Sequence, residues 1–227
     1  MNPYTAIKLS LIVAFASTIL STPFAIFLGW ILARLKFRGK FLLSTIIFIP
    51  LVLPPVVTGL LLLDFLGRNS FLGNILLKLG FPVSFSLFGA VIASFIVGLP
   101  LYIMLMRNSF ESVDRRYEEM AMTLGYSPFK TFFKFTLPMS YPGIMAGAVV
   151  AFARALGEFG ATVIVAGNME GKTRTISLAI YSLLDMPGAE QESTFLVWVS
   201  IALALFSLIT FELLNRWHKK RMGDFHV

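Results

Sequence analysis

Residues Glu111–Pro138 read ESVDRRYEEMAMTLGYSPFKTFFKFTLP, a charged loop in a chain that is otherwise mostly apolar. Asp114 can cap a helix, and apolar side chains follow it at helical spacing. Gly125 then supplies a left-handed stop, and Ser127 and Pro128 restart a helix as its N-cap and first residue. Two short helices joined at a glycine, between membrane segments, predict a docking element for a partner protein.

The composition places this charged loop in a membrane protein. The 227 residues are 57% hydrophobic and 14% charged, whereas soluble domains are about a quarter charged. In such a chain the formal net charge of +7 indicates topology before it indicates nucleic-acid binding. The absence of cysteine excludes a disulfide framework and a thiolate metal site. We therefore expect an all-α polytopic membrane protein, a single domain over residues 1–227, with lipid and no nucleic acid around it.

Five apolar segments are long enough to cross a bilayer, which takes about 20 apolar residues. They cover residues 9–33, 41–63, 84–106, 139–166 and 194–214. Thirteen of the nineteen Lys and Arg residues then fall on one side of the membrane. Because Lys and Arg mark cytoplasmic loops, we expect an external N-terminus, a cytoplasmic C-terminus and a cytoplasmic charged loop. The apolar residues 175–184 are too few for a crossing, so we expect a re-entrant or interfacial helix on the outer side.

The second predicted crossing carries three prolines. Pro50, Pro54 and Pro55 remove backbone hydrogen bonds, and such backbone is tolerated only where it faces protein or a water-lined cavity. Thr58 follows them closely and could add a hydroxyl to the same wall. This segment is therefore either a wall of a transport pathway or a kink that serves packing.

The fourth predicted crossing combines small residues with a charged pair. Gly143, Gly147 and Ala151 lie at four-residue spacing, which permits close packing against another span or a second copy. Arg154 and Glu158 follow one helical turn apart, at a depth where a lone charge costs about 2.5–3.5 kcal/mol. They could line an anion path or form a buried ion pair that fixes the helix. We favour the ion pair, because a fully paired Arg has little left for a substrate.

Patterns typical of catalysis or metal binding are absent from the sequence. There is no HExxH, GxSxG or EF-hand pattern, and both histidines, His218 and His226, lie in the C-terminal tail. The run AGNMEGKT at Ala166–Thr173 nearly spells a P-loop, but its first glycine is displaced and no buried strand precedes it. We expect no catalytic residue, no metal site and no bound cofactor in this chain.

The charged loop resembles the cytoplasmic loop of importer-type ABC-transporter permeases. Their pattern is Glu-Ala-Ala, three residues, Gly, nine residues, Ile, one residue and Leu-Pro. The matching residues here are Glu119, Ala121, Gly125, Leu137 and Pro138. The chain departs at Met120 and Phe135, which both stay apolar. The resemblance implies that the loop fits a cleft on a separate ATPase subunit, which binds the ATP and Mg²⁺; an ordinary amphipathic loop helix is the alternative.

Other runs are similar to those of bacterial and archaeal molybdate permeases. They are PLVLPPVVTGLLLL at Pro50–Leu63, ARALGEFGATVIVAGN at Ala153–Asn168 and GKTRTISLAIY at Gly171–Tyr181. This resemblance covers nearly the whole chain and implies a five-helix permease core in the cell membrane. It also implies three kinds of partner: a second copy, two ATPase subunits and an external oxyanion-binding protein. The transported ion would be molybdate or tungstate, selected by the binding protein, because tight binding inside a pore would prevent release.

Three alternatives remain open at this stage. Sulfate or thiosulfate permeases of the same superfamily share the run around Arg154 and Glu158 but tend to differ after it. A secondary transporter driven by an ion gradient is another, although such proteins often contain inverted repeats and none is visible here. The third is a membrane scaffold or regulator without a transported substrate.

Overall fold

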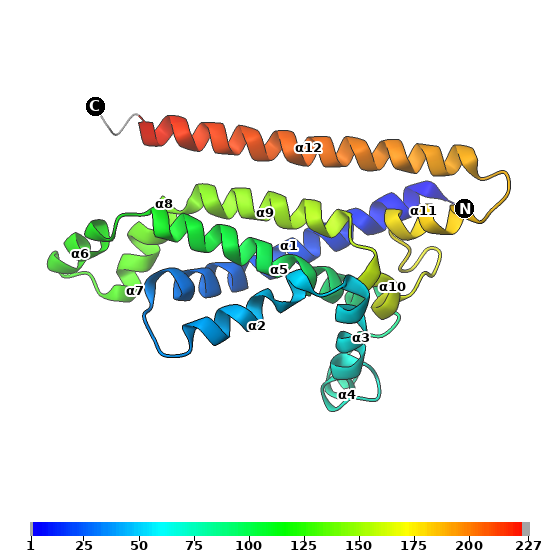
Figure 1. Ribbon diagram of the computed structural model, residues 1–227, viewed down its shortest axis with the longest axis horizontal. Coiled ribbons are helices and arrows are strands. Elements are labelled where there is room, and N and C mark those ends of the chain that lie inside the picture. Colours follow the sequence, from blue (N-terminus) through cyan, green and yellow to red (C-terminus); the bar gives the residue numbers. More distant parts are fainter. Residues whose placement is uncertain (1, 224–227) are drawn as a thin grey trace.

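The computed structural model describes residues 2–223, with side chains for residues 2–214 and 216, and every regular element in this range is a helix. The helices are α1 (Pro3–Arg34), α2 (Lys40–Val52), α3 (Pro55–Leu66), α4 (Phe71–Lys78), α5 (Leu87–Ser112), α6 (Arg115–Thr123), α7 (Pro128–Thr131), the π-helix η1 (Phe132–Thr136), α8 (Leu137–Met139), α9 (Tyr141–Leu156), α10 (Gly160–Ala166), α11 (Ile176–Leu184) and α12 (Glu190–Gly223). The expected all-α class is confirmed. Figure 1 shows an elongated bundle with α6 and α7 at one end and the N-terminus at the other.

Three helices, α1, α5 and α12, are each long and apolar enough to cross a membrane. Two bent pairs could add one crossing each: α2 with α3, and the segment Pro128–Met139 with α9. Their axes bend by 115° and 66°. The described helices therefore allow three to five crossings, and the five-crossing topology stays a prediction.

The expected crossing at residues 41–63 is two helices that point in different directions. The chain is extended at Leu53 and Pro54, between the end of α2 and the start of α3. A residue before proline avoids the helical region, and two successive prolines lack the N–H groups that would continue the helix. Figure 1 shows α3 and α4 projecting from the side of the bundle as a result.

The expected crossing at residues 139–166 is also interrupted. Helix α9 ends at Leu156, and α10 begins only at Gly160. The apolar run at residues 175–184 forms α11, a short helix as its length predicts. Whether α11 enters the membrane stays a prediction.

The core lies where α1, α5 and α9 meet. Tyr102 is fully buried there, and its hydroxyl donates a hydrogen bond of 3.0 Å to the carbonyl oxygen of Ile144. The small-residue stripe of α9 faces α5: a Cβ on Gly147 would lie 2.4 Å from the ring of Tyr102, and one on Gly143 would lie 2.2 Å from Ser109. The close packing expected of this stripe is thus made with another helix of the same chain.

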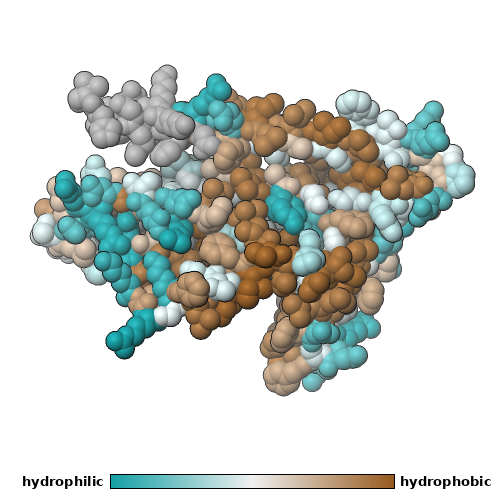
Figure 2. Space-filling model, viewed as in Figure 1, coloured by the Kyte–Doolittle hydropathy of each residue, from teal (hydrophilic) through white to brown (hydrophobic). Residues whose placement is uncertain are grey.

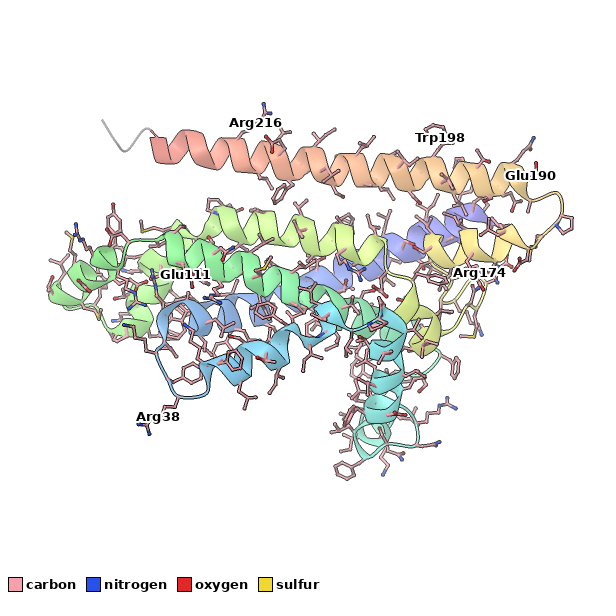
Figure 3. All side chains as sticks on the ribbon, viewed as in Figure 1. Arg38, Glu111, Arg174, Glu190, Trp198 and Arg216 are labelled. Carbon is pink, nitrogen blue, oxygen red and sulfur yellow. The ribbon has the colours of Figure 1, made fainter. Side chains whose placement is uncertain are left out.

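Apolar and charged residues separate along the long axis. Figure 2 shows hydrophobic side chains across the middle of one face and hydrophilic side chains toward its ends. In Figure 3, Arg38 and Glu111 lie toward the end that carries α6, and Arg174 and Glu190 lie toward the opposite end. This arrangement is that of a bundle whose apolar middle faces lipid.

Candidate functional site

The charged loop forms its helices at the residues that the sequence indicates. Asp114 accepts the backbone N–H of Arg116 at 2.9 Å and caps α6, and Ser127 accepts that of Lys130 at 3.4 Å and caps α7. Gly125 has φ +86°, and the following Tyr126 N–H reaches back to the carbonyl of Ala121 at 3.1 Å. This is the six-residue closure in which glycine at the left-handed position ends a helix.

The second part of the loop is one continuous helical segment. It runs from α7 through η1 and α8 to Met139, with Leu137 and Pro138 inside it, and the bend comes at Ser140. Phe132 in η1 packs edge-on against Trp30 of α1, with ring centroids 5.6 Å apart, and also contacts Phe110 of α5. The aromatic residues of this segment therefore fasten the loop to the bundle as well as facing outward.

The two faces of α6 have different surroundings. Ala121, a residue of the loop pattern, is only 2% exposed, and the helix that carries it packs against α7 and η1. Glu119 and Gly125 are exposed. The outer surface is unusually apolar for a loop, with exposed side chains at Tyr117, Met120, Met122, Leu124, Phe129 and Phe133. An exposed apolar patch of this kind, rimmed by charge, marks an interaction site.

Glu118 is a site residue that the sequence reasoning missed. Its Oε1 accepts hydrogen bonds from Arg34 Nε and from Thr136 Oγ1, both at 2.9 Å. It lies three positions before the buried Ala121 and so shares the inward face of α6. This helical spacing is the feature of the sequence that could have indicated Glu118. Its partner Arg34 is 84 residues away in the sequence, and helical periodicity says nothing about such a contact.

The charged pair of the fourth predicted crossing closes the break between α9 and α10. Arg154 Nη1 lies 2.7 Å from Glu158 Oε2, and the Glu158 side chain is 2% exposed against 30% for Arg154. The other oxygen of Glu158 accepts the backbone N–H of Ala161 at 2.9 Å, at the start of α10. The Glu158 carboxylate thus pairs with Arg154 of α9 and caps the start of α10. This geometry is that of an ion pair rather than of a free Arg that faces an anion path.

Helix α3 packs on α10 next to this break. A Cβ on Gly160 would lie 3.0 Å from Pro55, and one on Gly59 would lie 3.0 Å from Ala161. The structure therefore brings Pro55 close to the segment that follows Glu158, whereas Pro54 is exposed at the N-cap of α3.

Buried hydroxyls accompany this contact. Thr58 in α3 and Thr162 in α10 are 4% and 1% exposed, and their hydroxyls have no hydrogen-bond partner among the described residues. Buried hydroxyls normally find a partner, which can be water. A pathway wall formed by Pro54, Pro55, Thr58, Arg154 and Glu158 stays a prediction.

The stretch that nearly spells a P-loop is an irregular turn after α10. Thr173 Oγ1 accepts the N–H of Met169 at 3.1 Å and donates to the carbonyl of Gly167 at 3.3 Å. A helix rather than a strand precedes it, so the context that a phosphate-binding loop needs is missing from this part of the chain.

Comparison of the sequence with known proteins identifies a family and several relatives. A family model described as "Binding-protein-dependent transport system inner membrane component" matches residues 25–224. The chain is 47% identical to the molybdenum transport system permease protein ModB of Haemophilus influenzae, and the match covers 98% of each chain. It is 45% identical to ModB of Escherichia coli K12, over 97% of this chain and 96% of the relative. The sulfate transport system permease protein CysT of Salmonella typhimurium is 34% identical, over 96% of this chain and 79% of that protein.

Solved structures share the fold at low sequence identity. One is the MetNI methionine ABC transporter in an inward-facing conformation, with a TM-score of 0.70, 13% identity and coverage of 95% of this chain and 94% of that one. Another is a bacterial ABC transporter that imports alginate, with a TM-score of 0.69, 19% identity and coverage of 96% and 79%.

Proposed function

Because this chain belongs to the family of binding-protein-dependent transport system inner membrane components, we propose that it is the permease subunit of an ATP-driven importer for molybdate or tungstate. The observation that carries the substrate is the identity of 45–47% over nearly the full length of two molybdenum permeases, against 34% for a sulfate permease. The chain itself supplies the path through the membrane, and chemistry with ATP and Mg²⁺ belongs to a separate ATPase.

The charged loop is the surface that meets this ATPase. Its apolar outer face needs a partner, and its inner face is held to the bundle by Ala121, Phe132 and Glu118. Because the outer face can bind a partner and the inner face is fixed to the bundle, a movement of the partner can displace the loop and, through it, the helices of the bundle. The exposed Glu119 gives the rim of this surface a charge that an ATPase cleft can recognise.

We infer the rest of the assembly from membership of the same family. We place a second copy of the chain beside the first, two ATPase subunits on the cytoplasmic side and an oxyanion-binding protein outside. The N-terminus is external, the C-terminus and charged loop are cytoplasmic, and the complex lies in the cell membrane. Each bent helix pair counts as one crossing in this arrangement, which gives five.

A sulfate permease is the second candidate, because the sulfate relative also aligns over 96% of this chain. The proposal is tested by uptake into proteoliposomes that contain the permease with its ATPase, ATP inside and its oxyanion-binding protein outside. Labelled molybdate should accumulate only with ATP, and a tenfold excess of tungstate should compete with it where sulfate does not. Uptake of sulfate in preference to molybdate would support the sulfate assignment, and uptake without ATP would support a secondary transporter.

A further inference from the structure

We propose that Arg34 and Glu118 form the joint through which movement of the charged loop reaches α1, which makes Glu118 a positioning residue for transport. This inference rests on the proposed function, because it requires an ATPase that displaces α6. It assigns a mechanical role to one part-buried ion pair that joins segments far apart in the sequence.

The first half of the joint lies at the end of α1. Arg34 is the last residue of that helix, and its side chain is only 7% exposed. Its Nη2 lies 2.9 Å from Glu118 Oε1 and donates to the carbonyl of Val113 at 2.8 Å. Val113 is the C-cap residue of α5, so one guanidinium contacts the ends of two long helices and the inner face of α6.

The second half of the joint lies in η1. Thr136 is 1% exposed, and its hydroxyl donates to the same Oε1 of Glu118 that Arg34 contacts. A carboxylate that accepts from a cation and a hydroxyl is held more firmly than one with a single partner. Glu118 therefore ties α6 to α1 and to the segment that leads into α9.

A second contact runs parallel to this joint. Arg115, in the first turn of α6, directs Nη2 toward the carbonyls of Ala33 and Arg34, at 3.4 and 3.3 Å. The last carbonyls of a helix have no partner within that helix, and an Arg side chain can supply one. The inner face of α6 thus holds both the side chain and the backbone at the end of α1.

The chain connections of α6 cannot replace these contacts. On one side α6 is reached through Val113 and Asp114, which are both extended, and on the other side it ends at the left-handed Gly125. Without the contacts that Glu118 and Arg115 make to α1, α6 could turn about these two points while α1 stayed in place. With the joint, a displacement of α6 has to move the end of α1 as well.

The test compares uptake per ATP hydrolysed in the reconstituted complex with its ATPase and its binding protein. Glu118→Gln keeps the shape of the side chain and removes its charge. We expect the ATPase to stay bound and to hydrolyse ATP, while molybdate uptake per ATP falls by about tenfold, as loss of a coupled network contact can produce. Glu212→Gln is the matched control, because it removes the charge from an exposed pair with Arg216 within α12 and should leave the ratio unchanged.

A double variant separates a mechanical role from a structural one. Arg34→Met with Glu118→Gln leaves no unpaired charge, so a structural role predicts that coupling recovers, whereas the joint predicts that uptake per ATP stays low. Recovery in the double variant, or a normal ratio in Glu118→Gln, would overturn the joint while leaving the importer assignment intact. Failure of the wild-type complex to import molybdate with ATP would overturn both. If the complex with Glu118→Gln does not assemble, uptake per ATP in the double variant alone decides between the mechanical and the structural role.

Discussion

Tyr102 lies against Gly147 so closely that a methyl group on the glycine would come within 2.4 Å of the tyrosine ring. The ring cannot easily move away, because Tyr102 is fully buried and its hydroxyl is bonded to the backbone of the neighbouring helix. We therefore expect Gly147→Ala to force α5 and α9 apart and to destabilise the protein by about 1–3 kcal/mol, the range for overpacked cores. Thermal unfolding in detergent measures this as a lower melting temperature.

Gly98→Ala is the control for that substitution. Gly98 is buried in α5, but the nearest atom to its added Cβ is the Ala151 carbonyl oxygen at an ordinary 3.9 Å. Alanine also favours a helix over glycine by about 1 kcal/mol. The melting temperature of Gly98→Ala should equal or exceed that of the wild type, and an equal fall in both variants would contradict the close-contact explanation.

Gly125→Ala should weaken binding of the ATPase. Its φ of +86° costs an L-residue about 1–2 kcal/mol, and relief of that strain would turn α7 away from α6. Co-purification with the ATPase measures the loss. Gly39→Ala carries the same strain at φ +96° in the loop before α2, and neither glycine has an atom within 4 Å of an added Cβ. If the two variants retain the ATPase equally well, the turn at Gly125 does not shape the docking surface.

Glu119→Lys should uncouple transport without unfolding the chain. The side chain is exposed on α6, so its replacement should change stability by no more than about 0.5 kcal/mol. The reversed charge would be repelled where a wild-type carboxylate is recognised, at the rim of the apolar outer face that contacts the ATPase cleft. Measured ATP turnover should then respond little to the loaded binding protein, and normal stimulation in this variant would count against the role of Glu119.

Arg154→Met should harm folding more than Arg154→Met combined with Glu158→Gln. The single change leaves a carboxylate that is 2% exposed without its cation, and breaking a buried pair costs about 3–5 kcal/mol. The double change removes the buried charge and keeps an oxygen that can accept the Ala161 N–H at the start of α10. The fraction of monodisperse protein after extraction distinguishes them, and a worse double variant would mean that the pair is not what holds the break together.

Local chemistry was predictable from the sequence, and long-range geometry was not. Asp114, Gly125 and Ser127 take the capping and turn positions that their residue types predict, because these contacts lie within a few residues. Pro54 and Pro55 predict a break, but the 115° angle depends on how α3 packs on α10. The two crossings expected at residues 41–63 and 139–166 are interrupted, the first at Leu53 and Pro54 and the second between Leu156 and Gly160.

The contacts of Glu118 show the same contrast between local features, which the sequence predicts, and long-range contacts, which it does not. Helical spacing places Glu118 and Ala121 on one face of α6, but it cannot say that Arg34 lies opposite. The π-helix at Phe132–Thr136 was also missed, since no residue type there indicates it. Arg154 and Glu158 were predictable as a pair because both partners lie within one helical turn.

The most direct test of docking to a cytoplasmic ATPase is to measure which side of the membrane the outer face of the charged loop lies on. The chain contains no cysteine, so Leu124→Cys introduces a single thiol at a position that is 75% exposed in the wild type. Lys172→Cys, in the exposed turn after α10, is the control for the opposite side. A membrane-impermeant maleimide should label Leu124→Cys in inside-out vesicles and Lys172→Cys in right-side-out vesicles. Labelling of Leu124→Cys from the outside alone would contradict docking to a cytoplasmic ATPase.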